Sequence, residues 1–378
     1  MKLTLQIQLL PERDHAARLK ATVERFNEAA NWAAGVAFER RCSNKVALQK
    51  IVYRDLRERF NLSAQMAVRC IAQVCEAYRR DKTIRPEFRT HAAMPHDRRT
   101  MSFKGPDRVS LLSLDGRVLV AYIMGKYQRE RFTNAKGQAD LVLRKDGKWF
   151  LLVTVDVLES APIPTTDFLG VDMGLANIAT DSEGEKYSGE PVDKVRRKHN
   201  LQRKRLQRKG TKGAKKKLKR DAKKEARFRK HQNHCIAKKI VAKAKGTGRG
   251  IAVELLDGIR ERVTARGPEA RSRLSGWSFH QLYSFLSYKA QLAGVSVKRV
   301  DPAYTSQTCP ECGHCERSNR RSQSEFRCKA CGHEQHADVV GARNVRDAAL
   351  SHDGALVARN ANHRTGRPPR LSRKAPGL

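Results

Sequence analysis

The segment Phe168–Gly174 constrains the fold most, because it reads FLGVDMG and puts one acid, Asp172, into an apolar run. Phe, Leu and Val are strand formers, so the segment predicts a buried strand. A carboxylate inside such a strand costs roughly several kcal/mol unless it is paired or binds a cation. The alternative is a strand that simply ends in a turn at Asp172.

Two later segments repeat this arrangement of one acid in an apolar element. Ile251–Leu255 predicts a second apolar strand that carries Glu254, and a helix predicted at 336–350 opens with Asp338. Carboxylates from separate elements are what hard divalent cations require, and Mg²⁺ binds one or two of them together with water and phosphate. The sequence therefore predicts a Mg²⁺ or Mn²⁺ site at Asp172, Glu254 and Asp338.

The chain of 378 residues carries a formal net charge of +38. Such an excess indicates a polyanionic partner, with nucleic acid first and a membrane surface second. The sequence has no apolar run of spanning length, and it starts directly as a strand without the apolar region of a signal peptide. Its nine cysteines do not make an even disulfide framework. We therefore expect a reducing, cytoplasmic location.

The length predicts two or three domains, and the N-terminal part of the chain shows two kinds of periodicity. Positions 1–10 alternate as the first strand of a β domain, 11–95 repeat at helical spacing, and 96–160 contain two Asp-Gly hairpin signals between alternating runs. We therefore expect a helical domain and an antiparallel, barrel-like β domain. Four basic residues of the β domain fit an ordinary solvated face and a nucleic-acid contact equally well: Lys104, Arg108, Lys126 and Arg129.

The densest charge lies at 194–230, where Lys and Arg fill more than half of the positions and the only acids are Asp221 and Glu225. Gly210–Gly213 interrupts the run, so we expect two helices within a basic insertion at 191–245. Such runs are usually disordered tails or solvated faces, but this one lies between two strands of the predicted metal site. We interpret it as a surface that binds phosphate backbones. Its predicted contacts are Arg196, Arg197, Lys198, Arg203, Lys204, Arg205, Arg208, Lys209, Lys215, Lys216, Lys219, Arg220 and Lys223.

Two CxxC pairs follow near the C-terminus, at 309–312 and 328–331. Two such pairs at this spacing predict a tetrahedral Zn²⁺ site in a ribbon, with Cys309, Cys312, Cys328 and Cys331 as its ligands. The alternatives are a redox pair or a chance arrangement. Cys315, His314 and His333 lie near the pairs but outside the CxxC positions, so we expect them not to bind the metal.

Two other polar stretches carry weaker signals. Residues 258–276 are polar and basic, which predicts a loop or lid, and the basic tail at 351–378 has the composition of a disordered segment. Asp257 follows Glu254 by three positions, and we expect it to lie outside the metal site.

Five motifs together resemble a known family. They are Leu169–Gly174, Val253–Leu255, Ser287–Ala290, Tyr304–Gly313 and Ala337–Val345. In this order they resemble the TnpB family, transposon-encoded RNA-guided nucleases that are related to the compact type V CRISPR effectors. One departure lies two positions after Asp338, where many members carry Asn and this chain has Val340 followed by Gly341.

The resemblance implies an α+β, multidomain protein. It implies a RuvC-like (RNase H-type) nuclease core at 165–303, an inserted zinc ribbon at 304–335 and a last core helix at 336–350. It also implies that Asp172, Glu254 and Asp338 are the catalytic residues, and that Mg²⁺ or Mn²⁺, Zn²⁺ and a guide RNA are the cofactors. The expected target is double-stranded DNA beside a short recognition motif.

Elementary chemistry agrees with this function, because two Mg²⁺ ions about 4 Å apart can hold both the attacking and the leaving oxygen of a phosphodiester. We expect base pairing to the guide RNA to select the target. Three alternatives stay open. They are an RNA-guided DNA-binding repressor without efficient cleavage, a DNA transposase with the same carboxylate chemistry, and a guide-independent junction resolvase. The sequence does not decide between a monomer and a dimer.

Overall fold

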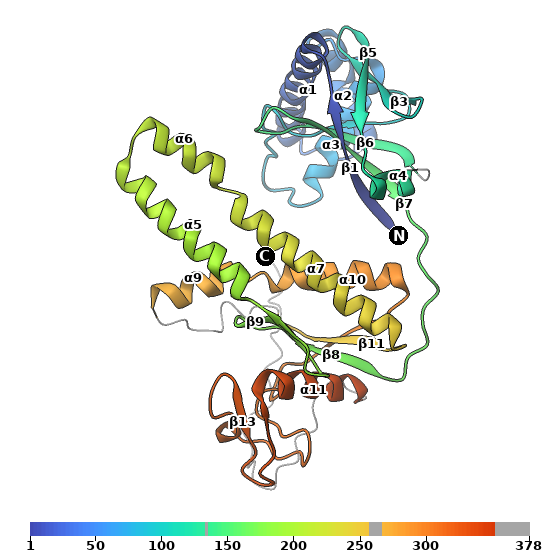
Figure 1. Ribbon diagram of the computed structural model, residues 1–378. Helices are drawn as coiled ribbons and strands as arrows, with labels where there is room; N and C mark the ends of the chain where they lie inside the picture. Colours follow the sequence, from blue (N-terminus) through green and yellow to red (C-terminus); the bar gives the residue numbers. More distant parts are fainter. Residues whose placement is uncertain (133–134, 257–266, 352–378) are drawn as a thin grey trace. The chain divides into compact units, whose positions relative to one another are not determined.

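The computed structural model describes residues 1–132, 135–256 and 267–351, and the chain divides into two compact units, Met1–Leu158 and Glu159–Leu378 (Figure 1). Both units are α+β, as the sequence predicts. The expected helical region and the expected β domain both fall within the first unit. They share one hydrophobic core, in which Phe26 of a helix and Ile7 of a strand are fully buried.

The first unit contains a seven-stranded antiparallel sheet. Its order is β2-β6-β7-β1-β5-β4-β3, with β1 (Lys2–Leu10), β2 (Met94–His96), β3 (Met101–Lys104), β4 (Arg108–Ser113), β5 (Gly116–Ile123), β6 (Ala135–Leu143) and β7 (Trp149–Asp156). β1 pairs with β7 on one side and β5 on the other. The first strand of the chain therefore lies inside this sheet, between β7 and β5.

Helices α1 (Arg13–Glu39), α2 (Lys45–Glu58), α3 (Ala64–Tyr78) and α4 (Lys126–Phe132) complete this unit. The side chains of Asn44 and Ser63 accept hydrogen bonds from backbone amides in the first turns of α2 and α3, as expected for residues that cap helix N-termini. Apolar residues on one face of α1, among them Leu19 and Val23, are fully buried in the shared core. The first unit is thus organised around the packing of α1 against the sheet.

The second unit is built on a five-stranded mixed sheet. Its order is β10-β9-β8-β11-β12, with β8 (Phe168–Asp172), β9 (Asn177–Asp181), β10 (Lys186–Ser188), β11 (Gly250–Glu254) and β12 (Val297–Val300). β8, β11 and β12 run parallel, whereas β9 and β10 are antiparallel to their neighbours. Parallel strands are buried on both faces, which agrees with the continuous apolar runs in the sequence.

Helices cover both faces of this sheet (Figure 1). α7 (Lys224–Gly246) and α10 (Phe279–Ala293) pack on one face, where Leu169 and Ile251 are buried with them. α11 (Ala337–Leu350) covers the other face, where Val345 is buried with Ala252 and Val300. This arrangement brings the N-terminal end of α11 toward the carboxyl ends of the central strands.

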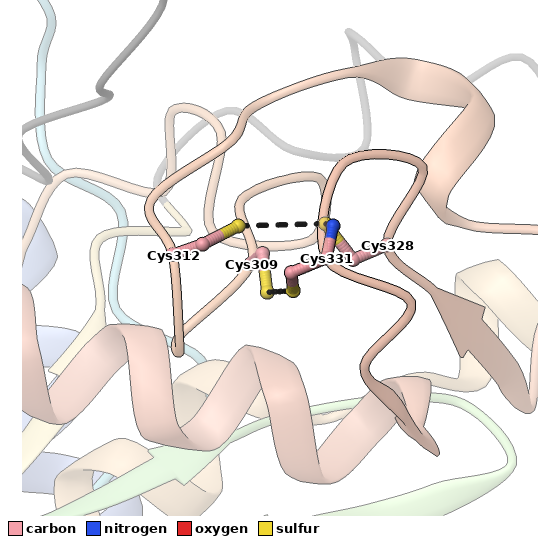
Figure 2. Close-up of side chains that lie close together, drawn as sticks. All are labelled: Cys309, Cys312, Cys328 and Cys331. Carbon is pink, nitrogen blue, oxygen red and sulfur yellow. Dashed lines mark hydrogen bonds between the residues drawn. The ribbon is translucent and has the colours of Figure 1, made fainter.

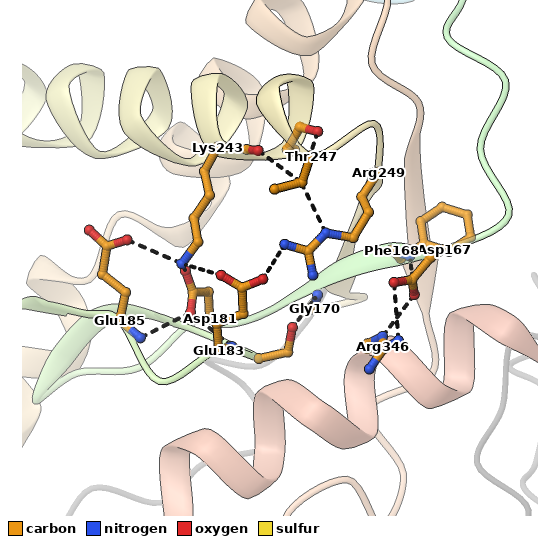
Figure 3. A network of polar contacts seen from close by, with 12 residues as sticks. Asp167, Phe168, Gly170, Asp181, Glu183, Glu185, Lys243, Thr247, Arg249 and Arg346 are labelled. Carbon is orange, nitrogen blue, oxygen red and sulfur yellow. Dashed lines mark hydrogen bonds and ion pairs between the residues drawn. The ribbon is translucent and has the colours of Figure 1, made fainter.

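Gly170 allows α11 to approach β8 closely. A Cβ atom at this position would lie 2.0 Å from the carbonyl oxygen of Ala342 and 2.7 Å from the backbone nitrogen of Arg346. Arg346 also forms a two-pronged ion pair with Asp167, at 2.8 Å (Nε–Oδ1) and 3.0 Å (Nη2–Oδ2), just before β8 (Figure 3). Substitution of Gly170 would therefore displace the helix that carries Asp338.

Two expectations about the helices need correction. The basic insertion forms three helices, α5 (Glu190–Lys209), α6 (Lys212–Asp221) and α7, because the chain breaks again at 222–223 before α7 begins. The stretch expected as a loop or lid includes a helix, α9 (Pro268–Gly276), with proline in its first turn, where the missing N–H costs no hydrogen bond. Asp257 and residues 352–378 lie outside the described residues.

Among the described residues, no helix combines the length and the apolar character that a membrane crossing requires.

Candidate functional site

Asp172 and Glu254 lie at the carboxyl ends of two adjacent parallel strands. Val171 of β8 pairs with Val253 of β11, so the next residue of each strand, Asp172 and Glu254, falls at the same edge of the sheet. Ligands of open α/β sheets bind outside this edge. The backbone register alone therefore brings together two acids that are far apart in the sequence.

Asp338 comes to the same edge from α11, where it occupies the first turn. The backbone amide of Asp338 donates to Nδ1 of His336 at 3.2 Å, and Asn177 of β9 donates its side-chain N–H to Oδ2 of Asp338 at 2.8 Å. Gly341 lies against the first acid, since a Cβ atom there would be 3.2 Å from Oδ2 of Asp172. The structure thus gathers the three predicted acids, which we call the carboxylate triad.

The triad is electrostatically unfavourable on its own. Burial raises the pKa of Asp172 well above its ordinary value, and the negative charges of Glu254 and Asp338 raise it further. Burial also raises the pKa of Glu254, with a smaller contribution from Asp301, whereas a hydrogen bond from Thr305 opposes the shift. Like charges in a desolvated site resist ionisation, so added positive charge beside the triad would favour its ionised form.

The three acids of the triad offer only carboxylate oxygens as ligands. The oxygen donors and the unmet negative charge both fit hard divalent cations.

Two residues that the sequence reasoning missed contact the triad from the segment 304–335. Oγ1 of Thr305 lies 2.6 Å from Oε1 of Glu254. Nη2 of Arg320 lies 3.8 Å from Oδ1 of Asp338, and its charge lowers the pKa of both Asp172 and Glu254. Arg320 therefore offsets part of the negative charge. Arg320 carries no periodic or motif signal. Thr305 lies within the Tyr304–Gly313 motif, but the motif does not indicate which group its hydroxyl contacts.

A second acidic group, in β9 and the turn after it, is paired with cations of the chain itself (Figure 3). Lys243 of α7 contacts the fully buried Asp181 of β9 and also pairs with Glu183 and Glu185, at 2.9 and 3.3 Å. Arg249 pairs with Glu183 as well. Hydrogen bonds from Lys243 and Arg249 lower the pKa of Glu183. We call these five residues the balanced acid cluster.

The four predicted zinc ligands converge (Figure 2). The Sγ atoms of Cys309 and Cys331 lie 3.7 Å apart, and those of Cys312 and Cys328 lie 3.5 Å apart. Tetrahedral zinc with Zn–S bonds of about 2.3 Å places sulfur atoms about 3.8 Å from one another. The sulfur positions and the all-thiolate donor set therefore fit one zinc ion.

The two CxxC turns have the same backbone geometry. The amide of Cys309 donates to the carbonyl oxygen of His314, and the amide of Cys328 donates to that of His333, each at 2.9 Å. Gly313 and Gly332 follow the second cysteines with φ angles of 75° and 78°. This left-handed conformation suits glycine. The repeat of one turn at both CxxC positions supports a metal site over a chance arrangement.

Three other residues lie near the cysteine cluster. Among the described residues, Cys315, His314 and His333 are not part of the four-cysteine group, and His314 lies 3.2 Å from Glu316. Val340 of α11 is fully buried in a small core with Phe326 and Cys309. The family departure at Val340 therefore places an apolar residue where α11 packs against the cysteine-bearing segment.

The predicted phosphate-binding residues lie on α5 and α6 and at residue 223, between α6 and α7. Twelve of the thirteen are exposed. Arg196 differs, since it is only 6% exposed, and its guanidinium contacts Asp193 at 3.1 Å and Oγ of Ser272 at 3.0 Å. Arg196 therefore supports the base of α5 rather than belonging to the exposed surface. The remaining twelve residues are called the basic surface.

The basic residues of the β domain named above, Lys104, Arg108, Lys126 and Arg129, are all exposed.

Two protein families and one curated protein match long stretches of this chain. A family described as "Probable transposase" matches residues 150–256, and a family described as "Cas12f1-like, TNB domain" matches residues 279–345. The "Putative RNA-guided DNA endonuclease InsQ" of Escherichia coli (strain K12) is 30% identical over 307 residues, which cover 74% of this chain and 74% of that protein. The chain belongs to the TnpB family.

Two further comparisons match this chain to Cas12f1 proteins. The "CRISPR-associated endodeoxyribonuclease Cas12f1" of Sulfoacidibacillus thermotolerans is 31% identical over 252 residues, which cover 60% of this chain and 58% of that protein. A cryo-EM structure of a Cas12f1–sgRNA–target DNA complex matches with a TM-score of 0.61 at 15% identity, covering 89% of this chain and 83% of that one. At this identity the structural match shows that this TnpB chain shares the fold.

Proposed function

We propose that the protein is an RNA-guided DNA endonuclease that hydrolyses phosphodiester bonds at the carboxylate triad with Mg²⁺ or Mn²⁺. The observation that carries this proposal is the meeting of Asp172, Glu254 and Asp338 at one edge of the sheet. The pKa values of Asp172 and Glu254 are raised, and Arg320 offsets only part of the negative charge. The relatives named as RNA-guided or CRISPR-associated nucleases support the substrate class. The strand order, with an antiparallel pair beside three parallel strands, supports a RuvC-like core of the RNase H type.

Each residue of the triad has a defined part in this proposal. Asp172 and Glu254 would bind divalent metal from neighbouring strand ends, and Asp338 would bind it from the helix. When bound, two such ions activate a water molecule and stabilise the leaving oxygen of the phosphodiester. Asn177 donates to Oδ2 of Asp338, and Oδ1 of the same carboxylate lies 3.8 Å from Arg320. Arg320 adds a positive charge beside Asp338, where a phosphate group would approach.

The cysteine cluster would hold one zinc ion with a structural role. Four thiolate ligands fill a tetrahedral site and leave no position for substrate. The zinc would therefore stabilise the segment 304–335 as a ribbon, and this segment carries Thr305 and Arg320 to the triad. Its contribution to cleavage is the placement of these two residues.

The basic surface would bind the backbone of guide RNA, target DNA or their heteroduplex. Exposed Lys and Arg side chains along α5 and α6 suit phosphates and carry no sequence information by themselves. Base pairing to the guide would then select the target, while the first unit would read a short motif beside it. Binding through phosphates would also make affinity strongly dependent on salt.

The experiment that tests this function starts from protein purified together with its cellular RNA. The bound RNA is sequenced, and DNA that matches its variable end is offered with Mg²⁺ beside DNA that does not match. We expect one discrete RNA and cleavage of the matching DNA alone. Heterogeneous RNA that has no effect on cutting would contradict the guided function, and tight guided binding without cleavage in Mg²⁺ or Mn²⁺ would favour a repressor.

A further inference from the structure

Glu254 is held by a hydroxyl group that reaches it from outside the sheet. Thr305 is 3% exposed, and its Oγ1 lies 2.6 Å from Oε1 of Glu254 and 3.0 Å from the carbonyl oxygen of Pro302. A hydroxyl group donates only one proton, and a hydrogen bond to a carboxylate is the stronger one. When Glu254 is ionised, Thr305 therefore donates to its Oε1 and leaves Oε2 available for metal.

Thr305 is itself fixed by α11. The side chain of Asn344 is fully buried, and its Nδ2 donates to the carbonyl oxygens of Thr305 and Thr308, at 2.7 Å each. These two bonds use both protons of the amide group. The helix that carries Asp338 in its first turn thus also sets the position of Glu254, through Asn344 and Thr305.

The same turn leads directly into the cysteine cluster. The amides of Gln307 and Thr308 both donate to the carbonyl oxygen of Tyr304, which has a φ of 64°. A non-glycine residue in this region persists only where its surroundings hold it there. Cys309, the first metal-binding cysteine, follows Thr308 immediately. The segment that positions Glu254 is therefore anchored on one side by Asn344 and on the other by the ribbon.

We propose that Thr305 is a positioning residue for Glu254, and that Asn344 and the zinc ribbon together hold Thr305 in place. The inference rests on the proposed function and adds how the ribbon controls the metal site. A glutamate has a long, flexible side chain, and ordering it costs conformational entropy. Fixing one of its oxygens before metal arrives removes part of that cost. Partners that hold metal-binding side chains typically change metal affinity or activity by about 10–100-fold.

The test compares two substitutions at Thr305 in full-length protein purified with its RNA. Thr305→Val keeps the branched shape and removes the hydroxyl, whereas Thr305→Ser keeps the hydroxyl. Mn²⁺ binding is measured by electron paramagnetic resonance without target DNA, and the Mn²⁺ concentration for half-maximal cleavage is measured with it. We expect Thr305→Val to weaken Mn²⁺ binding and shift the cleavage curve by about 10–100-fold. Thr305→Ser should stay close to the wild type, with zinc content unchanged in both.

Thr308→Val is the matched control. Thr308 is 1% exposed in the same turn, but its hydroxyl donates to the carbonyl oxygen of Tyr304 and not to a triad acid. We expect this variant to bind Mn²⁺ as the wild type does. An equal loss in Thr308→Val and Thr305→Val would show that the turn as a whole matters, which would overturn the positioning role.

Loss of zinc tests whether the ribbon, like Asn344, holds Thr305 in place. Cys331→Ser removes an exposed ligand, and we expect it to lose about one equivalent of zinc and to weaken Mn²⁺ binding together with it. Unchanged Mn²⁺ binding after zinc loss would overturn the coupling. A wild-type protein that neither binds Mn²⁺ nor cuts guided DNA would contradict the proposed function. A wild-type protein that cuts, with Thr305→Val indistinguishable from it, would contradict this inference alone.

Discussion

The second unit contains two groups of acids, and they differ in what balances their charge. In the balanced acid cluster, Lys243 and Arg249 supply positive charge from the chain itself, and the pKa of Glu183 is lowered. In the carboxylate triad, burial and mutual repulsion raise the pKa of Asp172, and Arg320 offsets only part of the charge. Acids gathered without a full set of partners are typical of functional sites, whereas acids paired within the chain stabilise the fold.

Removal of one triad acid should give the largest effect. In Asp172→Ala, the site loses a ligand at the strand end, so the rate of guided cleavage should fall at least about 10³-fold, comparable to the loss of a single preorganised electrostatic group. Glu254→Gln and Asp338→Asn should act similarly, and combined substitutions should not add, because the three act as a unit. Guided target binding should survive. The measurement is a single-turnover cleavage assay beside a binding assay, and a variant that cuts at the wild-type rate would remove its residue from the site.

Removal of a cation from the balanced acid cluster should lower the stability of the protein and change the cleavage rate little. Lys243→Met leaves the fully buried Asp181 without its lysine partner, and breaking a buried ion pair in this way costs about 3 kcal/mol. The free energy of unfolding should therefore drop, while the cleavage rate at temperatures where the variant stays folded should change little. Calorimetry and the same cleavage assay check both parts. A large loss of rate with unchanged stability would show that this cluster has a catalytic role.

The two groups should also differ in their response to pH. Because the folded state raises the carboxyl pKa values of Asp172 and Glu254, it binds more protons there than the unfolded state does. Their contribution to stability is greatest below the ordinary carboxyl pKa of about 4 and is lost as the pH rises through the raised values. In magnesium-free buffer the melting temperature should therefore fall with rising pH more in the wild type than in Asp172→Asn. Equal slopes in the two proteins would contradict the strained triad.

The smallest effects should come from the basic surface. Each exposed phosphate contact that is removed should lower the slope of log affinity against log salt by about 0.9 for duplex DNA. We expect Arg205→Ala and Arg208→Ala to show this change in equilibrium binding of non-specific duplex. Arg196→Ala lies on the same helix but changes a buried residue, so it should lower stability and leave the slope unchanged. A slope change in Arg196→Ala as large as in Arg205→Ala would place Arg196 on the binding surface after all.

The acids of the triad and the cysteines of the cluster could be singled out from the sequence because each has a local signal. Asp172 and Glu254 interrupt apolar strands, Asp338 opens a helix, and the cysteines repeat a spacing. The strand register then brings Asp172 and Glu254 together without further help.

The residues that hold these ligands could not be predicted in the same way. Thr305 contacts an acid 51 positions away, and Asn177 contacts one 161 positions away. Both are ordinary polar residues whose partners are fixed only by the packing of α11 and the ribbon. The burial of Arg196 could not be predicted for the same reason, since neither its position in a basic run nor its spacing distinguishes it from its exposed neighbours.

The most direct test of the difference between the two acid groups is Mn²⁺ binding in the absence of target DNA. The wild type and Lys243→Met, measured where both are folded, should each bind about two Mn²⁺ ions at the triad, whereas Asp172→Ala should lose or strongly weaken this binding. If Asp172→Ala binds Mn²⁺ as the wild type does, the carboxylate triad is not the metal site.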